Sequence, residues 1–167
     1  MPLAGHYLAT RPVETPVQRL LVFFITGNPG LVDYYGLFLH RIAYRLEKAD
    51  ETSHITVAGT SLAGFDTPAD KAYNGSYPVD LAAQTDFVMA RLNAKIHGLN
   101  KSVPDPPPHV ILVGHSIGAY MLLEILANAR RSPSLMSADL AGGICLFPTI
   151  VDIARSSTGR LIKVACI

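Results

Sequence analysis

The stretch VILVGHSIGAYMLLEIL, residues 110–126, constrains the fold more than any other part of the chain. A strand pattern over residues 109–113, aliphatic from Val110 to Val113, leads into a glycine-rich turn, and residues 117–129 then form a helical pattern that is apolar nearly all round. A strand without alternation is buried on both faces, and a helix without a polar face is buried as well. Both segments therefore belong inside a layered structure in which helices cover a sheet.

The rest of the chain alternates strand and helix patterns in the same way. A continuous apolar run at residues 20–26 is typical of a parallel strand buried on both faces, and residues 54–59 and 143–147 are expected to form further short strands. Apolar spacings of three and four predict a helix that follows GNPG and ends near Ala49, and a second helix that Asp80 caps. The alternation predicts an α/β fold, with a mostly parallel sheet, right-handed crossovers and helices on both faces.

The length and composition indicate one domain that covers residues 1–167. Charged residues are 16% of the chain and apolar residues 49%, so few charges are expected on the surface. The 14 basic and 13 acidic residues include no run of like charge, which argues against nucleic acid as a partner. Cys145 and Cys166 lack the spacing of a metal site, and no metal or cofactor is expected. Cys145 lies in the apolar run GGICLF and is expected to be a buried, reduced thiol.

The N-terminal residues show no secretion signal, because they lack a basic start followed by an apolar core. The longest wholly apolar runs, such as LLVFFI, fall far short of the ~20 residues that span a bilayer. We therefore expect a protein that is cytosolic or lies on a membrane or lipid surface. The sequence does not determine its oligomeric state.

The candidate catalytic feature is the motif Gly-x-Ser-x-Gly, formed by Gly114, Ser116 and Gly118. Alone it is weak, because chance gives about one match in twenty chains of this length. Here it follows a strand and opens a buried helix, the setting in which a sharp elbow lifts a nucleophilic serine above the sheet. Side chains at Gly114 and Gly118 would collide with the neighbouring strand and helix. The alternative is an inert serine in a tight turn.

Backbone N–H groups on two segments are expected to bind the oxyanion of acyl transfer. The helix after the elbow offers the N–H of Ile117, and one such donor contributes ~3–4 kcal/mol to transition-state stabilisation. The turn from Gly27 through Asn28 to Gly30 ends the first strand at the same edge of the sheet, and Asn28 is the expected second donor. A plain β-turn is an equally good explanation of Gly27 and Gly30.

The sequence offers no catalytic base. In this fold the acid and the histidine follow the nucleophile, and no histidine follows His115. His115 adjoins Ser116, so the two side chains diverge, and we expect His115 to be a packed or hydrogen-bonded neighbour. Asp139 and Asp152 are expected to be surface or capping residues. No role is assigned to His6, His40, His54, His97 and His109, and the last four are expected on flanking helices or at strand ends opposite the crevice.

Three blocks of sequence together resemble the lipid droplet-associated hydrolase family of α/β-hydrolases, with a fungal member as the expectation: FFITGNPGLVDYY, GHSIGAYM and LFPTIVDIARSSTGR. The resemblance runs from Leu20 to about Arg160. It implies a partial α/β-hydrolase fold with Ser116 as nucleophile and with Asn28 and Ile117 at the oxyanion positions. It also implies hydrolysis of carboxylic esters of neutral lipids such as sterol esters, and residence on lipid droplets or in the cytoplasm.

The same resemblance implies that the chain is truncated, because family members are roughly twice as long and carry the acid and the histidine in the later half. Without a triad histidine, turnover falls by ~10⁴ to 10⁶, so the chain is expected to be close to inactive. One alternative is a non-catalytic protein that binds lipid or a partner through exposed apolar surface. Another is an esterase from a different α/β-hydrolase branch that acts on small soluble esters.

Overall fold

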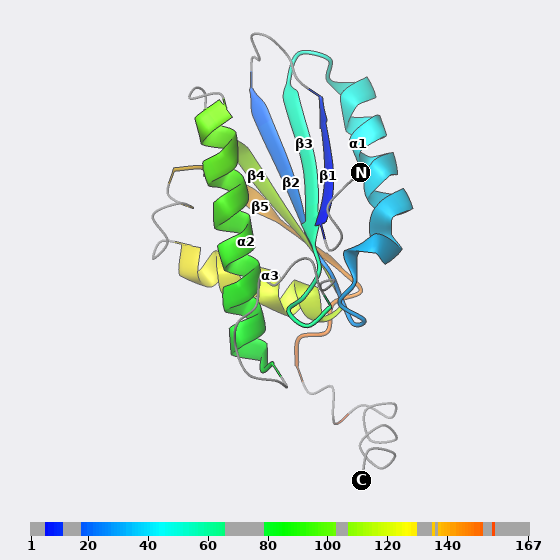
Figure 1. Ribbon diagram of the computed structural model, residues 1–167, viewed down its shortest axis with the longest axis vertical. Helices are drawn as coiled ribbons and strands as arrows, with labels where there is room; N and C mark the ends of the chain where they lie inside the picture. The colour runs from blue at the N-terminus through cyan, green and yellow to red at the C-terminus, as the bar shows by residue number, and fades with distance from the viewer. Residues whose placement is uncertain are drawn as a thin grey trace.

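The computed structural model describes residues 6–11, 18–65, 79–102, 107–129, 135, 137–151 and 155. Its centre is a five-stranded sheet in the order β1-β3-β2-β4-β5 (Figure 1). The strands are β1 (His6–Arg11), β2 (Arg19–Ile25), β3 (His54–Thr60), β4 (His109–His115) and β5 (Asp139–Leu146). Strands β2 to β5 run parallel, and β1 pairs antiparallel with β3.

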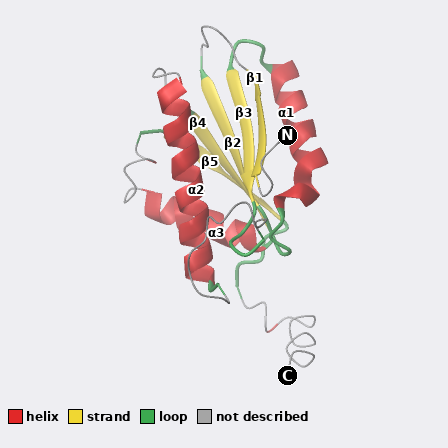
Figure 2. Ribbon diagram, in the orientation of Figure 1, coloured by secondary structure: helices red, strands yellow, loops and turns green. Residues whose placement is uncertain are grey.

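Helices cover both faces of this sheet. A 3-10 turn, η1 (Val32–Tyr35), leads into α1 (Gly36–Ala49) on one side, and α2 (Leu81–Ser102) and α3 (Ile117–Asn128) lie on the other side (Figure 1). The loop after β2 and the start of α3 meet at the lower end of the sheet in Figure 2. The predicted α/β class, with a mostly parallel sheet and helices on both faces, is confirmed.

Strand β2 shows why the apolar run at residues 20–26 has no alternation. Leu21, Phe23 and Ile25 belong to the core under α2 and α3, whereas Val22 and Phe24 belong to the core under α1. Because successive side chains of a strand point to opposite faces, a strand in the middle layer must be apolar at every position. Each such buried side chain contributes about 1.5–3 kcal/mol to folding.

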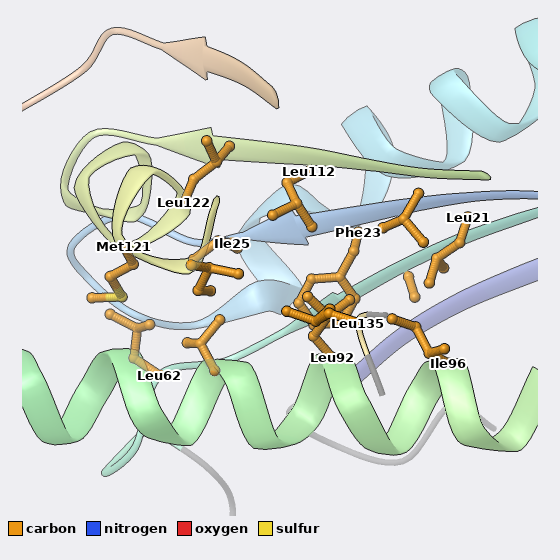
Figure 3. Close-up of a cluster of buried hydrophobic side chains, with 14 residues drawn as sticks. Leu21, Phe23, Ile25, Leu62, Leu92, Ile96, Leu112, Met121, Leu122 and Leu135 are labelled. Atoms are coloured by element: carbon orange, nitrogen blue, oxygen red, sulfur yellow. The ribbon is translucent and has the colours of Figure 1, made fainter. Parts of the chain in front are cut away.

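The core under α2 and α3 is the larger of the two clusters. Figure 3 shows Leu92 of α2 pointing toward Phe23 and Leu135. Met121, Leu122 and Ile125 of α3 and Leu92 and Ile96 of α2 are all buried in it: they are at most 1% exposed. The apolar composition of α3 predicted a helix that is buried on every side. The structure differs from this prediction, because Leu123 is 40% exposed.

Asp80 and Cys145 both lie in the part of the chain that the structure describes. Asp80 caps α2, since its Oδ1 accepts a hydrogen bond from the Ala83 N–H at 2.8 Å. Cys145 carries a free thiol that is half-buried against the core, whereas Cys166 lies outside the described residues. The cap is the one predicted, and the Cys145 thiol is less buried than expected.

The strand expected at residues 143–147 is shifted in the structure. It runs from Asp139 to Leu146, and its pairing with β4 skips Ala141 next to Gly142, whose φ is +154°. This irregularity interrupts the apolar pattern, because a glycine in a strand packs no side chain. The strand ends before Phe147, which has a positive φ of 45°.

Strand β1 was not predicted. Its sequence, HYLATR, is short and has only weak apolar alternation. Tyr7 and Ala9 pack against the core under α1, while Leu8 is 50% exposed on the opposite face. Pairing with β3 therefore orders a segment whose local sequence carries little strand signal.

We predict that His54, at the start of β3, makes stability depend on pH. Burial, and then the charge of Arg19, lower the pKa of its imidazole below the usual 6.5. The unfolded chain then binds a proton more readily than the folded protein does, so the free energy of unfolding should fall as the pH falls below about 6.5. Urea denaturation between about pH 5 and 8 measures this slope, and His54→Gln should flatten it.

Above the unfolded pKa His54 is neutral in both states, so the wild-type protein and His54→Gln should there share one pH dependence. An equally steep acid slope in both proteins would assign the effect to another group.

Candidate functional site

Ser116 lies at the junction of β4 and α3 in a strained backbone conformation, with φ 53° and ψ −119°. A positive φ costs a non-glycine residue about 1–3 kcal/mol, and the surroundings must hold it. The Ser116 N–H donates to the Leu146 carbonyl at 2.9 Å, and the Thr149 N–H donates to the Ser116 carbonyl at 3.1 Å. The segment at the end of β5 thus fixes the turn from one side.

The glycines that flank Ser116 allow backbone to approach backbone. A Cβ on Gly114 would lie 2.4 Å from the carbonyl oxygen of Gly118. A Cβ on Gly118 would lie 2.5 Å from the carbonyl oxygens of both Ile25 and Thr26. Since backbone atoms at this junction cannot move aside, the first turn of α3 reaches the end of β2 only because both positions are glycine.

The loop after β2 packs against the elbow through Gly27. A Cβ there would lie 2.7 Å from His115 Nδ1 and 2.9 Å from Ser116 Cβ. Asn28, the next residue, is exposed. Gly30 is buried, and a Cβ added to it would lie 2.6 Å from the Cβ of Leu62. The structure therefore brings the GNPG loop, Ser116 and the start of α3 together at one end of the sheet.

The side chain of Ser116 is half-buried, and its Oγ lies 3.2 Å from Thr149 Oγ1. Sequence reasoning did not select Thr149 as a site residue. The only signal for it was its place in the block LFPTIVDIARSSTGR, which was used for the resemblance alone and mostly lies outside the described residues.

His115 is the hydrogen-bonded neighbour that was predicted. Its Nδ1 lies 2.9 Å from the hydroxyl oxygen of Tyr35, and its ring meets Phe147 edge-on at 6.2 Å between centroids. Phe147 itself is 84% exposed. In the described part of the chain, Ser116 Oγ has a threonine and no histidine as its hydrogen-bond partner.

Two other histidines lie at the opposite end of the sheet, as expected. His109 Nδ1 is 2.7 Å from Asp139 Oδ2 where β4 and β5 begin, and the Asp139 side chain is 60% exposed. His54 Nε2 lies 3.0 Å from Thr10 Oγ1 at the start of β3. Asp139 is therefore a surface residue, as predicted.

The remaining acid and histidine candidates are also removed from Ser116. His40 and His97 lie on α1 and α2. His6 pairs with Thr60 at the site's end of the sheet, but β3 and β2 stand between its strand and β4. Three strand spacings separate the backbones by roughly 14 Å. Asp152 lies outside the described residues.

In the described part of the chain, no group of three or more His, Cys, Asp or Glu side chains is placed to hold a metal ion. Of the helices in that part, none combines the length and the hydropathy that a bilayer crossing requires.

We predict that Gly118→Ala destabilises the protein by about 2 kcal/mol or more, because the new methyl group meets two backbone carbonyls. Gly98→Ala is the matched control on α2: its Cβ meets nothing within 4 Å, so it should stabilise the protein by about 0.5–1 kcal/mol. Urea denaturation measures both changes. Equal stabilities for the two variants would contradict the close contact between α3 and β2.

Most of the chain, including the site, is similar to known proteins. A family model for lipid-droplet associated hydrolases matches residues 18–167. The lipid droplet-associated hydrolase of Mus musculus is 34% identical over 153 residues, which are 89% of this chain and 43% of the mouse protein. That of Drosophila melanogaster is 30% identical over 146 residues, which are 87% of this chain and 44% of the fly protein. The chain thus spans less than half the length of these curated relatives.

Solved structures show the same fold at low sequence identity. The peroxisomal alpha-beta-hydrolase of Saccharomyces cerevisiae has a TM-score of 0.56 and 12% identity, covering 90% of this chain and 47% of its own. Brefeldin A esterase, a bacterial homologue of human hormone sensitive lipase, has a TM-score of 0.53 and 16% identity, covering 97% and 46%. The fold is that of part of an α/β-hydrolase, and the chain belongs to the lipid droplet-associated hydrolase family.

Proposed function

We propose that these residues form the nucleophile half of one α/β-hydrolase domain, and that Ser116 attacks carboxylic esters of neutral lipids, such as sterol esters. The observation that carries the proposal is the strained turn of Ser116, which backbone contacts hold between β4 and α3. The chain also belongs to a hydrolase family. The names of the relatives support a location at the surface of lipid droplets, and the cytoplasm is the other proposed location.

In the proposed reaction a base takes the proton of Ser116 as its Oγ attacks the ester carbonyl carbon. The carbonyl oxygen becomes negative, and the backbone N–H groups of Ile117 and Asn28 bind it, each contributing ~3–4 kcal/mol. Ile117 opens α3, where the first N–H groups lack partners inside the helix. Collapse of the intermediate releases the alcohol, and water then hydrolyses the acyl group from Ser116.

The base is proposed to come from residues outside these 167. No histidine follows His115 in the sequence, and His115 contacts Tyr35 rather than Ser116 Oγ. The relatives have more than half of their length outside the matched region, which leaves room for the base and its acid. The role of the present residues is to supply the nucleophile and the oxyanion donors.

We predict that the recombinant 167-residue chain is not labelled by a fluorophosphonate probe, because no base activates Ser116. Intact mass spectrometry measures the adduct, with Ser116→Ala as the control for reaction elsewhere. Loss of a triad histidine slows such chemistry by ~10⁴ to 10⁶. Labelling that depends on Ser116 would show that a base lies within these residues.

The native protein tests the nucleophile itself. In a lysate of cells that express it, the probe should modify the tryptic peptide of residues 102–130, and fragment ions should place the adduct on Ser116 rather than Ser102. If the same unmodified peptide is abundant while the adduct is absent, Ser116 is not an activated nucleophile.

The substrate class has its own test. Native protein that is labelled on Ser116 should hydrolyse an emulsified sterol ester faster than a short-chain soluble ester, because a neutral-lipid enzyme uses the long acyl and sterol groups for binding. Product release is measured for both esters under the same conditions. The opposite preference would instead indicate an esterase for small soluble esters.

A second candidate function is non-catalytic binding of lipid or of a partner. It is favoured by the apolar side chains that β5 and the segment after it expose: Phe147 is 84% exposed, Val151 79% and Ile144 50%. Exposed apolar groups in one region are typical of contact surfaces. Native protein that binds lipid emulsions but resists the probe would support this function over hydrolysis.

A further inference from the structure

The hydroxyl group of Tyr35 lies between the two segments that the proposed reaction uses. It accepts a hydrogen bond from the Gly27 N–H at 3.4 Å, and its oxygen lies 2.9 Å from His115 Nδ1. Gly27 begins the GNPG loop after β2, and His115 ends β4 directly before Ser116. One side chain from a third segment, η1, thus joins the loop to the elbow.

The ring of Tyr35 is held in place by packing. It lies 4.7 Å from the fully buried ring of Phe24 and 5.6 Å from the ring of His115, measured between centroids. The turn that carries it is anchored at its other end, where the N–H of the buried Val32 donates to Ser61 Oγ at 3.0 Å. The position of the hydroxyl is therefore set by the core. The adjacent Tyr34 is 72% exposed and provides a natural comparison.

The hydrogen-bond pattern around the Tyr35 hydroxyl favours one tautomer of His115. A tyrosine hydroxyl has a single proton to donate, and the described residues offer it one acceptor, His115 Nδ1. The Gly27 N–H already occupies an acceptor position on the same oxygen. In that arrangement His115 carries its proton on Nε2, and its Nδ1 lone pair accepts the hydrogen bond from Tyr35.

We propose that Tyr35 is a positioning residue that holds the Gly27–Asn28 loop against the elbow and fixes His115 as the Nε2–H tautomer. The inference rests on the proposed function, because the loop matters for catalysis only if the Asn28 N–H binds an oxyanion formed at Ser116. It also explains why the histidine beside Ser116 is not its base: neither ring nitrogen has a lone pair left for the serine proton.

The loop needs such a bond because its contact with the elbow is otherwise steric. Gly27 fits against His115 and Ser116 without a side chain, so no side chain of its own fixes its position along the elbow. Oxyanion donors act only when they stay at hydrogen-bond distance from the developing charge. The hydrogen bond to Tyr35 restricts movement of the Gly27–Asn28 loop along the elbow, and we expect the loop to become more mobile when this bond is lost.

Long-range ¹H–¹⁵N spectra of the native protein with ¹⁵N-labelled histidine test the proposal. The wild-type His115 ring, assigned with His115→Gln, should show a protonated Nε2 and a hydrogen-bond-accepting Nδ1. In Tyr35→Phe the Nδ1 resonance should move toward that of a free nitrogen. Amide hydrogen exchange at Gly27 should become about fivefold faster, the effect of losing one neutral hydrogen bond. Tyr34→Phe should change neither measurement.

A wild-type His115 that carries its proton on Nδ1 would overturn the proposal, and this measurement needs no variant to fold. Unchanged His115 and Gly27 signals in Tyr35→Phe would overturn it as well. Neither readout involves the reactivity of Ser116. If the tautomer is as expected but the native protein resists the fluorophosphonate probe, the role of Tyr35 stands and the proposed nucleophile fails. If the tautomer differs but the probe labels Ser116, only the role of Tyr35 is rejected.

Discussion

The first turn of α3 lies in backbone contact with the end of β2, and the geometry of the site depends on this contact. Gly118 meets the carbonyls of Ile25 and Thr26, and Gly114 meets the carbonyl of Gly118. No side chain separates the helix from the two strands, so the chain must turn within one residue. That residue is Ser116, and its positive φ is the cost of the close approach.

The other parts of the site follow from the same contact. With α3 drawn onto β2, the loop after β2 lies against His115 and Ser116, and Gly27 can fit there because it has no Cβ. The segment after β5 closes the turn from the other side through backbone hydrogen bonds to Ser116. The elbow is therefore held through backbone contacts by the ends of three neighbouring parallel strands.

Much of this could be predicted from local sequence. Strands β2 and β4 are unbroken apolar runs because they lie in the middle of the sheet. Glycine is required at the two motif positions because a side chain there would collide with neighbouring backbone. Strand β1 could not be predicted, because its order comes from pairing with β3 rather than from its own residues. The start of β5 was missed because the irregularity beside Gly142 hides the strand pattern.

The sequence by itself determined the α/β class, the turn that carries Ser116, and the fact that no histidine follows it. Only the tertiary structure decided that Thr149 contacts the Ser116 hydroxyl and that Tyr35 joins Gly27 to His115. The physical reason is separation along the chain. Periodicity and turn chemistry act within a few residues, whereas these contacts exist because the strand order brings the ends of β2, β4 and β5 side by side.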